Sequence, residues 1–334
     1  MELGPLEQNF NAHFSIFHQF STMNQKFAII DLGTNTFHLL IATFNGEGYT
    51  ITHRERAVVK IGMGGINQNI IQKGGIERTL EALKNFRTTI DQHAITEIYA
   101  FGTSAFRNAR NATDVTKIID QVTNIKVNII SGDEEAEFIY KGVISALDLG
   151  TDASLIMDIG GGSVEFIIGN RDQFFWKKSI EIGAQRLLEK FQKHDPISAQ
   201  EIKALDQYFE TSLTELLSAL QTHNPLTLVG SSGTFDTLSD IFCVQSSISI
   251  NEADRETPLT ISSFYSTYKK LISKNRAERL LIPGMIEMRV DMIVVACCLI
   301  RFILEKHPFK MVRVSTYALK EGVLAQLSKN NNRP

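Results

Sequence analysis

The sequence predicts an α/β protein built from two similar domains that face each other across a cleft. The strongest observation is an internal repeat, with AIIDLGTNTFHLLIATF at 28–44 and SLIMDIGGGSVEFIIGN at 154–170. Strands alternate with helices between and after the two copies, which is typical of an α/β fold with a mixed sheet. The length of 334 residues suits two domains, given a prior of about 150 residues for each.

Each copy of the repeat has the pattern of a buried strand, a turn of small residues and a second apolar strand. A third strand pattern follows each copy and ends at 61–62 and at 182–183. Equivalent positions of the two turns carry similar residues: Asp31 and Asp158, Gly33 and Gly160, Thr36 and Ser163.

Apolar periodicity predicts the other elements. The expected helices are 74–93, 111–123, 133–146, 183–193, 197–221, 260–273, 289–306 and 318–328. The expected strands are 97–102, 125–130 and 310–315, and 227–234 is expected to be a strand that runs into a turn. We expect a disordered extension at 1–25, a first domain at 26–149 that is completed by the C-terminal helix at 316–328, and a second domain at 150–315.

Composition excludes several classes of function. The net charge of −3 argues against a broad nucleic-acid binder, which needs a basic excess. No apolar run is long enough to span a bilayer, so no membrane partner is expected. Cys243, Cys297 and Cys298 have neither metal-ligand spacing nor a disulfide framework, and they suit a reducing cytoplasm.

The GGGS segment at 160–163 is a candidate phosphate loop. Its glycines allow the backbone to approach an anion closely. A dinucleotide or Walker loop leads into a helix, whereas the residues after Ser163 continue as a strand. A plain tight hairpin is the alternative, and the matching DLGTNT at 31–36 favours the phosphate loop.

Acidic side chains in the repeat are candidate ligands of Mg²⁺. Asp31 and Asp158 each end an apolar strand just before a turn, where a carboxylate can hold the ion beside a phosphate. Capping of the turn is the alternative role. Glu165 lies two residues beyond Ser163 on a strand and therefore points to the same side; the first copy has His38 at that position.

Three further segments follow strands and carry candidate site residues. GTSAFRNARNA at 102–112 offers the Ser104 hydroxyl and the Arg107 guanidinium, which suits phosphate, although solvated arginines are common. SGDEEAEF at 131–138 offers Glu134 and Glu135, and either could handle a water molecule or simply favour a helix N-terminus. LVGSSGTFDTL at 228–238 offers Ser232 and Gly233 as a phosphate flank or an ordinary helix cap.

Taken together, these motifs resemble the exopolyphosphatase/guanosine pentaphosphate phosphohydrolase family, which has the actin-like, sugar-kinase and Hsp70 ATPase fold. The resemblance runs from Lys26 to about Leu327 and includes PGMIEMRVDM with Arg289 and Asp291. It implies two ribonuclease-H-like (actin-like ATPase) domains with an interdomain cleft.

The resemblance also implies roles. Glu135 would handle the attacking water, and Arg107 would contact the phosphate chain. Asp158, Glu165 and Asp31 would hold Mg²⁺. The phosphate-binding positions would be Gly33, Thr34, Asn35, Thr36, Ser104, Gly160, Gly161, Gly162, Ser163, Ser232 and Gly233.

The function expected on this basis is Mg²⁺-dependent exopolyphosphatase activity that releases terminal orthophosphate from inorganic polyphosphate. Hydrolysis of guanosine pentaphosphate is the nearest alternative. A kinase of the same fold and a non-catalytic sensor of polyphosphate or nucleotide are others, because one fold hosts many activities. The expected partners are the phosphate substrate and a second copy of the chain in a homodimer.

Overall fold

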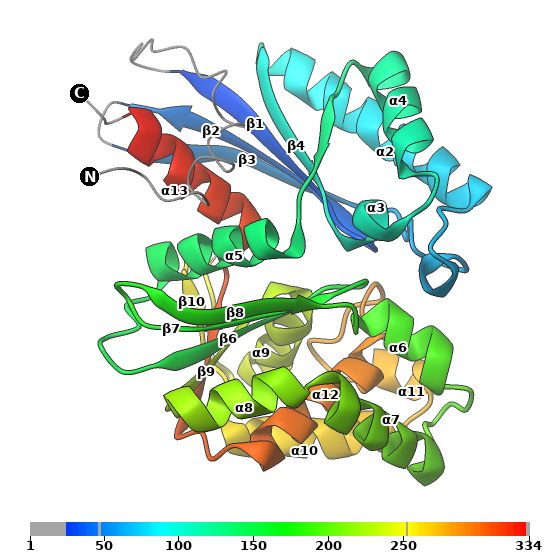
Figure 1. The fold of residues 1–334 in the computed structure, drawn as a ribbon, viewed down its shortest axis with the longest axis vertical. Coiled ribbons are helices and arrows are strands. Elements are labelled where there is room, and N and C mark those ends of the chain that lie inside the picture. Colours follow the sequence, from blue (N-terminus) through cyan, green and yellow to red (C-terminus); the bar gives the residue numbers. More distant parts are fainter. Residues whose placement is uncertain (1–24, 46–47, 252, 332–334) are drawn as a thin grey trace.

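The computed structural model describes residues 25–45, 48–251 and 253–331. Two sheets, each with its own helices, form the upper and lower halves of the molecule (Figure 1). Residues 1–24 of the predicted extension lie outside the described residues, while the backbone carbonyl of Gln25 accepts a hydrogen bond from the Phe44 N–H at 2.8 Å.

The first sheet has the strand order β3-β2-β1-β4-β5. Its strands are β1 (Lys26–Leu32), β2 (Thr36–Phe44), β3 (Tyr49–Val58), β4 (Glu97–Gly102) and β5 (Val127–Ile129). The long apolar runs of β1 and β2 are buried because helices cover both faces. One face packs on α2 (Lys73–Gln92) and α4 (Ala112–Thr123), and the other on α5 (Gly132–Ala146) and α13 (Leu319–Asn331).

The second sheet has the order β10-β11-β9-β6-β7-β8. Its strands are β6 (Ser154–Ile159), β7 (Val164–Gly169), β8 (Phe174–Ile180), β9 (Thr227–Ser231), β10 (Glu256–Thr257) and β11 (Met311–Ser315). Residues of β6 and β7 are buried along their whole length. Their outer face packs on helices that include the apolar α12 (Ile293–Lys306), and their inner face contributes Ile156 and Ile167 to the cluster beneath α5.

The remaining helices surround the lower half or shape the edge of the upper one. They are η1 (Ile66–Gln68), α3 (Ser104–Asn108), α6 (Ala184–Phe191), α7 (Ala199–Ser212), α8 (Thr214–His223), α9 (Ser232–Ser246), α10 (Ile261–Ser273) and α11 (Arg276–Leu280). No helix within the described part of the chain combines the length and apolarity that crossing a membrane would require.

The internal repeat is present in three dimensions. Strands β1 and β2 pair antiparallel and place Asp31 opposite His38, while β6 and β7 place Asp158 opposite Glu165 in the same register. The third strand of each unit is shorter than predicted and ends at Val58 or at Ile180. The residues that follow leave the sheet because their N–H groups bond to the small-residue turns instead.

Other differences from the sequence prediction have local causes. The helix predicted over 197–221 is two helices, α7 and α8, which meet at Leu213. The segment after β9 forms the 15-residue helix α9, whose many serine, threonine and aspartate residues have low helix propensity. The helix predicted from 289 begins at Ile293, and the strand predicted over 125–130 is confined to Val127–Ile129.

Helix α13 returns from the end of the chain to the first sheet. It crosses α5 and contacts β1. Helix α5 also contacts β7 and β8 and therefore lies between the two sheets (Figure 1). A Cβ atom on Gly322 would collide with the Phe138 carbonyl, and one on Gly142 would collide with the Ala318 carbonyl. The crossing therefore requires glycine on both helices, because only a residue without a side chain permits this approach.

Candidate active site

A pocket of about 190 Å³ lies between the two sheets, where the two repeat turns meet. It is also lined by residues from the start of α9, from α5 and from the beginning of α13. Most of the site residues predicted from sequence line it: Asp31, Gly33, Thr34, Asn35, Thr36, Ser104, Glu135, Asp158, Gly160, Gly161, Gly162, Ser163, Ser232 and Gly233. Arg107 and Glu165 lie behind this wall.

The two turns touch each other across the pocket. A Cβ atom on Gly161 would collide with the Asn35 amide, and one on Gly162 would collide with the hydroxyls of Ser104 and Thr34. Glycine is therefore needed at both positions of the second turn so that the two halves can approach. The close approach supports interpretation of GGGS as more than a plain hairpin.

Both turns are held by the segments that follow the third strands. The carbonyl of Asn35 accepts hydrogen bonds from the N–H groups of Val59 and Lys60, both at 2.9 Å. In the second half the carbonyl of Gly160 accepts from the Ala184 N–H at 2.9 Å, at the first turn of α6. Because the following segments bond to these carbonyls, each turn is fixed in shape by its own half of the molecule.

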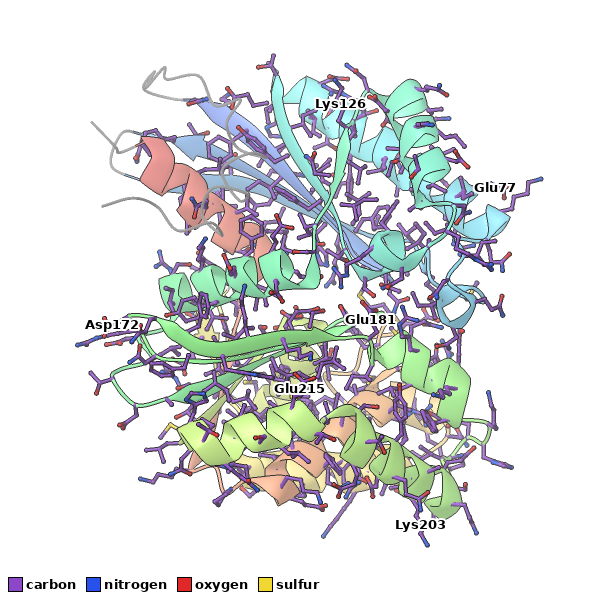
Figure 2. The ribbon with its side chains drawn as sticks, in the orientation of Figure 1. Glu77, Lys126, Asp172, Glu181, Lys203 and Glu215 are labelled. Atoms are coloured by element: carbon purple, nitrogen blue, oxygen red, sulfur yellow. The ribbon has the colours of Figure 1, made fainter. Side chains whose placement is uncertain are left out.

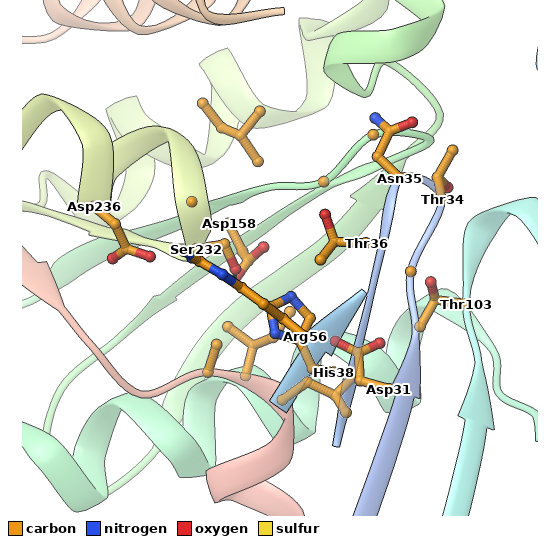
Figure 3. Close-up of a pocket in the computed structure, with 18 of the residues that line it drawn as sticks. Asp31, Thr34, Asn35, Thr36, His38, Arg56, Thr103, Asp158, Ser232 and Asp236 are labelled. Carbon is orange, nitrogen blue, oxygen red and sulfur yellow. Dashed lines mark hydrogen bonds between the residues drawn. The ribbon is translucent and has the colours of Figure 1, made fainter. Parts of the chain in front are cut away.

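Asp31 and Asp158 reach into the pocket from opposite halves (Figure 3). Asp158 Oδ2 accepts hydrogen bonds from the hydroxyls of Ser231 and Ser232, both at 2.6 Å. Ser232 has a φ of 68°, a left-handed conformation that is strained for serine and common at functional sites. Burial raises the pKa of Asp31 to about 6, and the nearby Asp158 adds to this rise; burial also raises the pKa of Asp158.

The two aspartates offer ligands suitable for Mg²⁺. Among the described residues, no group of three or more His, Cys, Asp or Glu side chains forms a complete metal cage. Mg²⁺ commonly uses one or two carboxylates together with water and substrate phosphates, so it does not need such a cage. Two carboxylates of raised pKa that face one pocket, a buried Asp158 and a half-buried Asp31, fit this ion, because a cation there would offset their repulsion.

Helix α5 turns Glu135 toward the pocket and Glu134 away from it. The Glu134 carboxylate accepts hydrogen bonds from the backbone N–H and the hydroxyl of Ser131, both at 2.8 Å, in a capping box. Glu135 is only 7% exposed, and its Oε2 lies 2.9 Å from Arg107 Nη1. The spacing of Ser131 and Glu134 is itself a capping-box signature, so the sequence contained the signal that separates the two glutamates.

Burial also dominates the electrostatics of Glu135. It raises the pKa of the Glu135 carboxyl well above its ordinary value, and the neighbouring Glu165 raises it further, while Arg107 lowers it. A carboxylate of raised pKa is a stronger base once it is deprotonated. Glu135 is therefore suited to accept a proton or a hydrogen bond from water in the pocket.

Arg107 and Glu165 form a layer behind Ser163. The Ser163 hydroxyl donates to Glu165 Oε1 at 2.7 Å, and the Ser179 hydroxyl donates to the same atom at 2.6 Å. Glu165 is 1% exposed, and burial followed by repulsion from Asp158 raises its pKa to about 7. Arg107 donates to Ser163 at 3.5 Å as well as to Glu135. These two residues thus contact the pocket through Ser163 and Glu135.

Several lining residues were not predicted as site residues. They include His38, Arg56, Thr103, Asp236, Asp240, Arg289 and Lys320. Burial, followed by the positive charges of Lys320 and Arg289, holds the pKa of His38 well below its usual range, so its ring is neutral. Four of them lie in segments that the sequence had singled out: His38 in the repeat, Thr103 in GTSAFRNARNA, Asp236 in LVGSSGTFDTL and Arg289 in PGMIEMRVDM.

Known proteins are similar to this chain in sequence or in fold. A crystal structure of an exopolyphosphatase from Cytophaga hutchinsonii is 42% identical in sequence, with a TM-score of 0.89 over 92% of this chain and 98% of that one. A bifunctional 3-dehydroquinate synthase/phosphatase from Fusobacterium nucleatum is 41% identical over 172 residues, which cover 49% of this chain. A guanosine-5'-triphosphate,3'-diphosphate pyrophosphatase from Pseudoalteromonas translucida is 28% identical over 306 residues, which cover 92% of this chain.

Both of these relatives, from Fusobacterium nucleatum and Pseudoalteromonas translucida, are longer proteins, and the matches span 26% of the first and 60% of the second. The model of the Ppx/GppA phosphatase family matches residues 40–331. That range contains the end of the second strand of the first repeat, the whole second repeat and the helix that carries Glu135. The chain therefore belongs to the Ppx/GppA phosphatase family, as its paired turns and the actin-like arrangement of its two sheets indicate.

Proposed function

We propose that this protein is an exopolyphosphatase that releases terminal orthophosphate from inorganic polyphosphate in the presence of Mg²⁺. The observation that carries the proposal is the meeting of two small-residue turns across one pocket, with the Glu135 carboxylate beside them. Such turns bring backbone N–H groups and hydroxyls near an anion. The 42% identical exopolyphosphatase of the same fold supports the choice of substrate.

In the proposed reaction, water attacks the terminal phosphorus in line with the bridging oxygen that leaves. Positioning and charge stabilisation supply most of the rate acceleration in such transfers. The two turns and the Ser104 hydroxyl hold the terminal phosphoryl group, and Glu135 orients the water and accepts its proton. Arg107, bonded to both Glu135 and Ser163, keeps these groups in place.

Mg²⁺ would be held by Asp31 and Asp158, with Glu165 supporting the site through Ser163. The ion would supply positive charge that offsets the charge on the phosphate chain. Arg56, Arg289 and Lys320 add fixed positive charge to the wall of the same pocket. The net charge of the whole chain can therefore be negative while the site attracts a polyanion.

Guanosine pentaphosphate is the second candidate substrate. The relative from Pseudoalteromonas translucida acts on such a nucleotide according to its name, and the reaction removes a terminal phosphoryl group in the same way. We also propose a cytoplasmic enzyme that forms a homodimer and binds no nucleic acid. The three free cysteines of the chain are what a reducing compartment maintains.

The deciding experiment measures orthophosphate release from polyphosphate and from guanosine pentaphosphate side by side, with Mg²⁺ and with a chelator. We expect release from polyphosphate at the higher kcat/KM, and release that requires the metal. Faster release from guanosine pentaphosphate would select the second substrate. Binding of either compound without phosphate release would support a sensor and contradict both hydrolase proposals.

A further inference from the structure

Glu181 lies between the two halves of the molecule, in the loop that joins β8 to α6 (Figure 2). Its carboxylate accepts a hydrogen bond from the Ser104 hydroxyl at 2.5 Å and one from Arg107 Nη2 at 3.2 Å. It also accepts one from Arg186 Nη2 at 3.0 Å. Three donors from both sides of the interface thus converge on one carboxylate.

Two of these three donors belong to the proposed phosphate site. Ser104 lines the pocket, and Arg107 bonds to Ser163 and Glu135. Arginine and hydroxyl groups bind carboxylate and phosphate oxygens in the same way. The Glu181 carboxylate therefore takes up the Ser104 hydroxyl, which an arriving phosphoryl group could also use, and it offsets part of the positive charge of Arg107 behind the pocket wall.

The third donor, Arg186, is fixed in place. Its Nε donates to the Gly162 carbonyl at 2.8 Å, and its Nη1 donates to the Ile66 carbonyl in the other half at 2.7 Å. It is only 9% exposed. Because Arg186 joins the second turn to the first half, it holds Glu181 near Ser104 when the pocket is empty.

Charge decides which acidic group must give way when an anion enters. Three glutamates surround Arg107, namely Glu135, Glu165 and Glu181, and a phosphoryl group adds further negative charge. Glu135 and Glu165 are 7% and 1% exposed, whereas the Glu181 side chain is 36% exposed. A carboxylate that already contacts water loses the least when it leaves its partners.

We infer that Glu181 is an internal anion that competes with the terminal phosphoryl group, and with the orthophosphate product, for the Ser104 hydroxyl and for the positive charge of Arg107. This inference rests on the proposed function of the pocket. Glu181 keeps Arg107 in position while the pocket is empty. It also lowers the affinity of the pocket for orthophosphate, so that the product dissociates. Glu181 is thus a positioning residue and not a group that reacts.

The test is the affinity of the full chain for inorganic phosphate, measured by calorimetric titration in the presence of Mg²⁺. Glu181→Gln keeps the shape and the acceptor oxygen but removes the charge. Glu189→Gln is the matched control, because Glu189 lies on the adjoining helix and bonds across the interface to the Gly64 N–H at 2.9 Å without contacting Ser104 or Arg107. Thermal unfolding of each variant shows whether it is folded.

We expect Glu181→Gln to bind phosphate about tenfold more tightly than the wild type, equivalent to about 1.4 kcal/mol, and Glu189→Gln to bind it as the wild type does. If the chain hydrolyses polyphosphate, Glu181→Gln should also have a lower KM and stronger product inhibition without a higher kcat. Unchanged or weaker phosphate binding in Glu181→Gln would overturn the inference.

The phosphate titration needs no turnover, so it separates this inference from the proposed function. A chain that releases no phosphate from either substrate, yet binds phosphate more tightly after Glu181→Gln, would contradict the hydrolase and support the competing anion. A second variant, Glu181→Ala, removes the acceptor as well as the charge. It should also bind phosphate more tightly; weaker binding would show that Glu181 only orients Arg107, contrary to the inference.

Discussion

At the scale of single residues, the site is a concentration of buried acids. Burial raises the pKa of Asp31, Glu135, Asp158 and Glu165 above their ordinary values. In the folded chain, the charged carboxylate form of each of these groups is disfavoured. Groups with such shifted pKa values are typical of functional sites. Arg107 and the serine hydroxyls offset only part of this effect.

The first prediction concerns Glu135. Glu135→Gln should lower kcat for phosphate release by about 10²- to 10⁴-fold, because it removes the group that accepts the proton of water. Affinity for the phosphate chain should be retained. Steady-state kinetics together with a binding titration measure the two effects separately.

Glu134→Gln is the control for that variant, since glutamine also completes a capping box and Glu134 bonds to Ser131 away from the pocket. It should keep wild-type kinetics. Wild-type kcat in Glu135→Gln, or an equal loss in both variants, would remove Glu135 from the mechanism.

At the scale of elements, the crossing of α5 and α13 brings together residues that are far apart in sequence. Helix α5 carries Glu135, and the first turn of α13 carries Lys320; both residues line the pocket. Leu324 and Val323 of α13 are fully buried in the cluster that also contains residues of both sheets. The pocket therefore depends on the distance between these two helices.

The second prediction tests that distance. Gly322→Ala places a methyl group against the Phe138 carbonyl, and overpacking of this kind typically costs about 1–3 kcal/mol. The unfolding transition should move to lower temperature, and kcat should fall because Glu135 and Lys320 move relative to each other. Calorimetry and phosphate release measure the two effects.

Gly74→Ala, near the start of α2, is the matched substitution. There a Cβ atom would meet only the end of the Arg78 side chain at 3.3 Å, and alanine favours a helix by up to about 1 kcal/mol over glycine. Stability should be unchanged or higher. A Gly322→Ala variant as stable as the wild type would show that the crossing tolerates a side chain.

At the scale of the whole molecule, the facing acids link folding to pH and to metal. Asp31 and Glu165 have pKa values of about 6 and about 7 in the fold, against 3.8 and 4.5 ordinarily. At pH values between the ordinary pKa and the raised pKa of each group, the folded chain binds more protons than the unfolded chain. The unfolding free energy contributed by these groups is therefore greatest at low pH and falls as pH rises from about 4 through about 7.

The third prediction follows from this linkage. Mg²⁺ bound to the carboxylates should restore the lost stability, since a ligand of the folded state raises its stability by mass action. The increase in Tm on adding Mg²⁺ should be larger at pH 8 than at pH 5. Thermal unfolding with Mg²⁺ and with a chelator, at both values, measures it.

Asp31→Asn should reduce this metal effect and should raise the Tm of the chelated protein at pH 8, because it removes a half-buried carboxylate of raised pKa. An equal response to Mg²⁺ at pH 5 and at pH 8 would show that the metal does not bind these carboxylates.

Much of the architecture could be predicted from patterns among residues that are neighbours in the sequence. The repeat predicted the paired strand–turn–strand units because their glycines, hydroxyls and apolar runs are neighbours in sequence. Strand β4 and helix α10 match their predicted ranges to within a residue for the same reason. For helix α9 the sequence indicated a helix cap at 228–238 only as an alternative, because packing, and not propensity, stabilises the rest of the helix.

Tertiary structure alone decided how the site is completed. Glu181 meets Ser104 across 77 positions of sequence, and Lys320 reaches the pocket only because α13 returns to the first sheet. No local pattern encodes such meetings, since they depend on how the two halves approach. The sequence determined which turns can bind an anion. The packing of α5 and α13 between the sheets determined which charged residues surround the pocket.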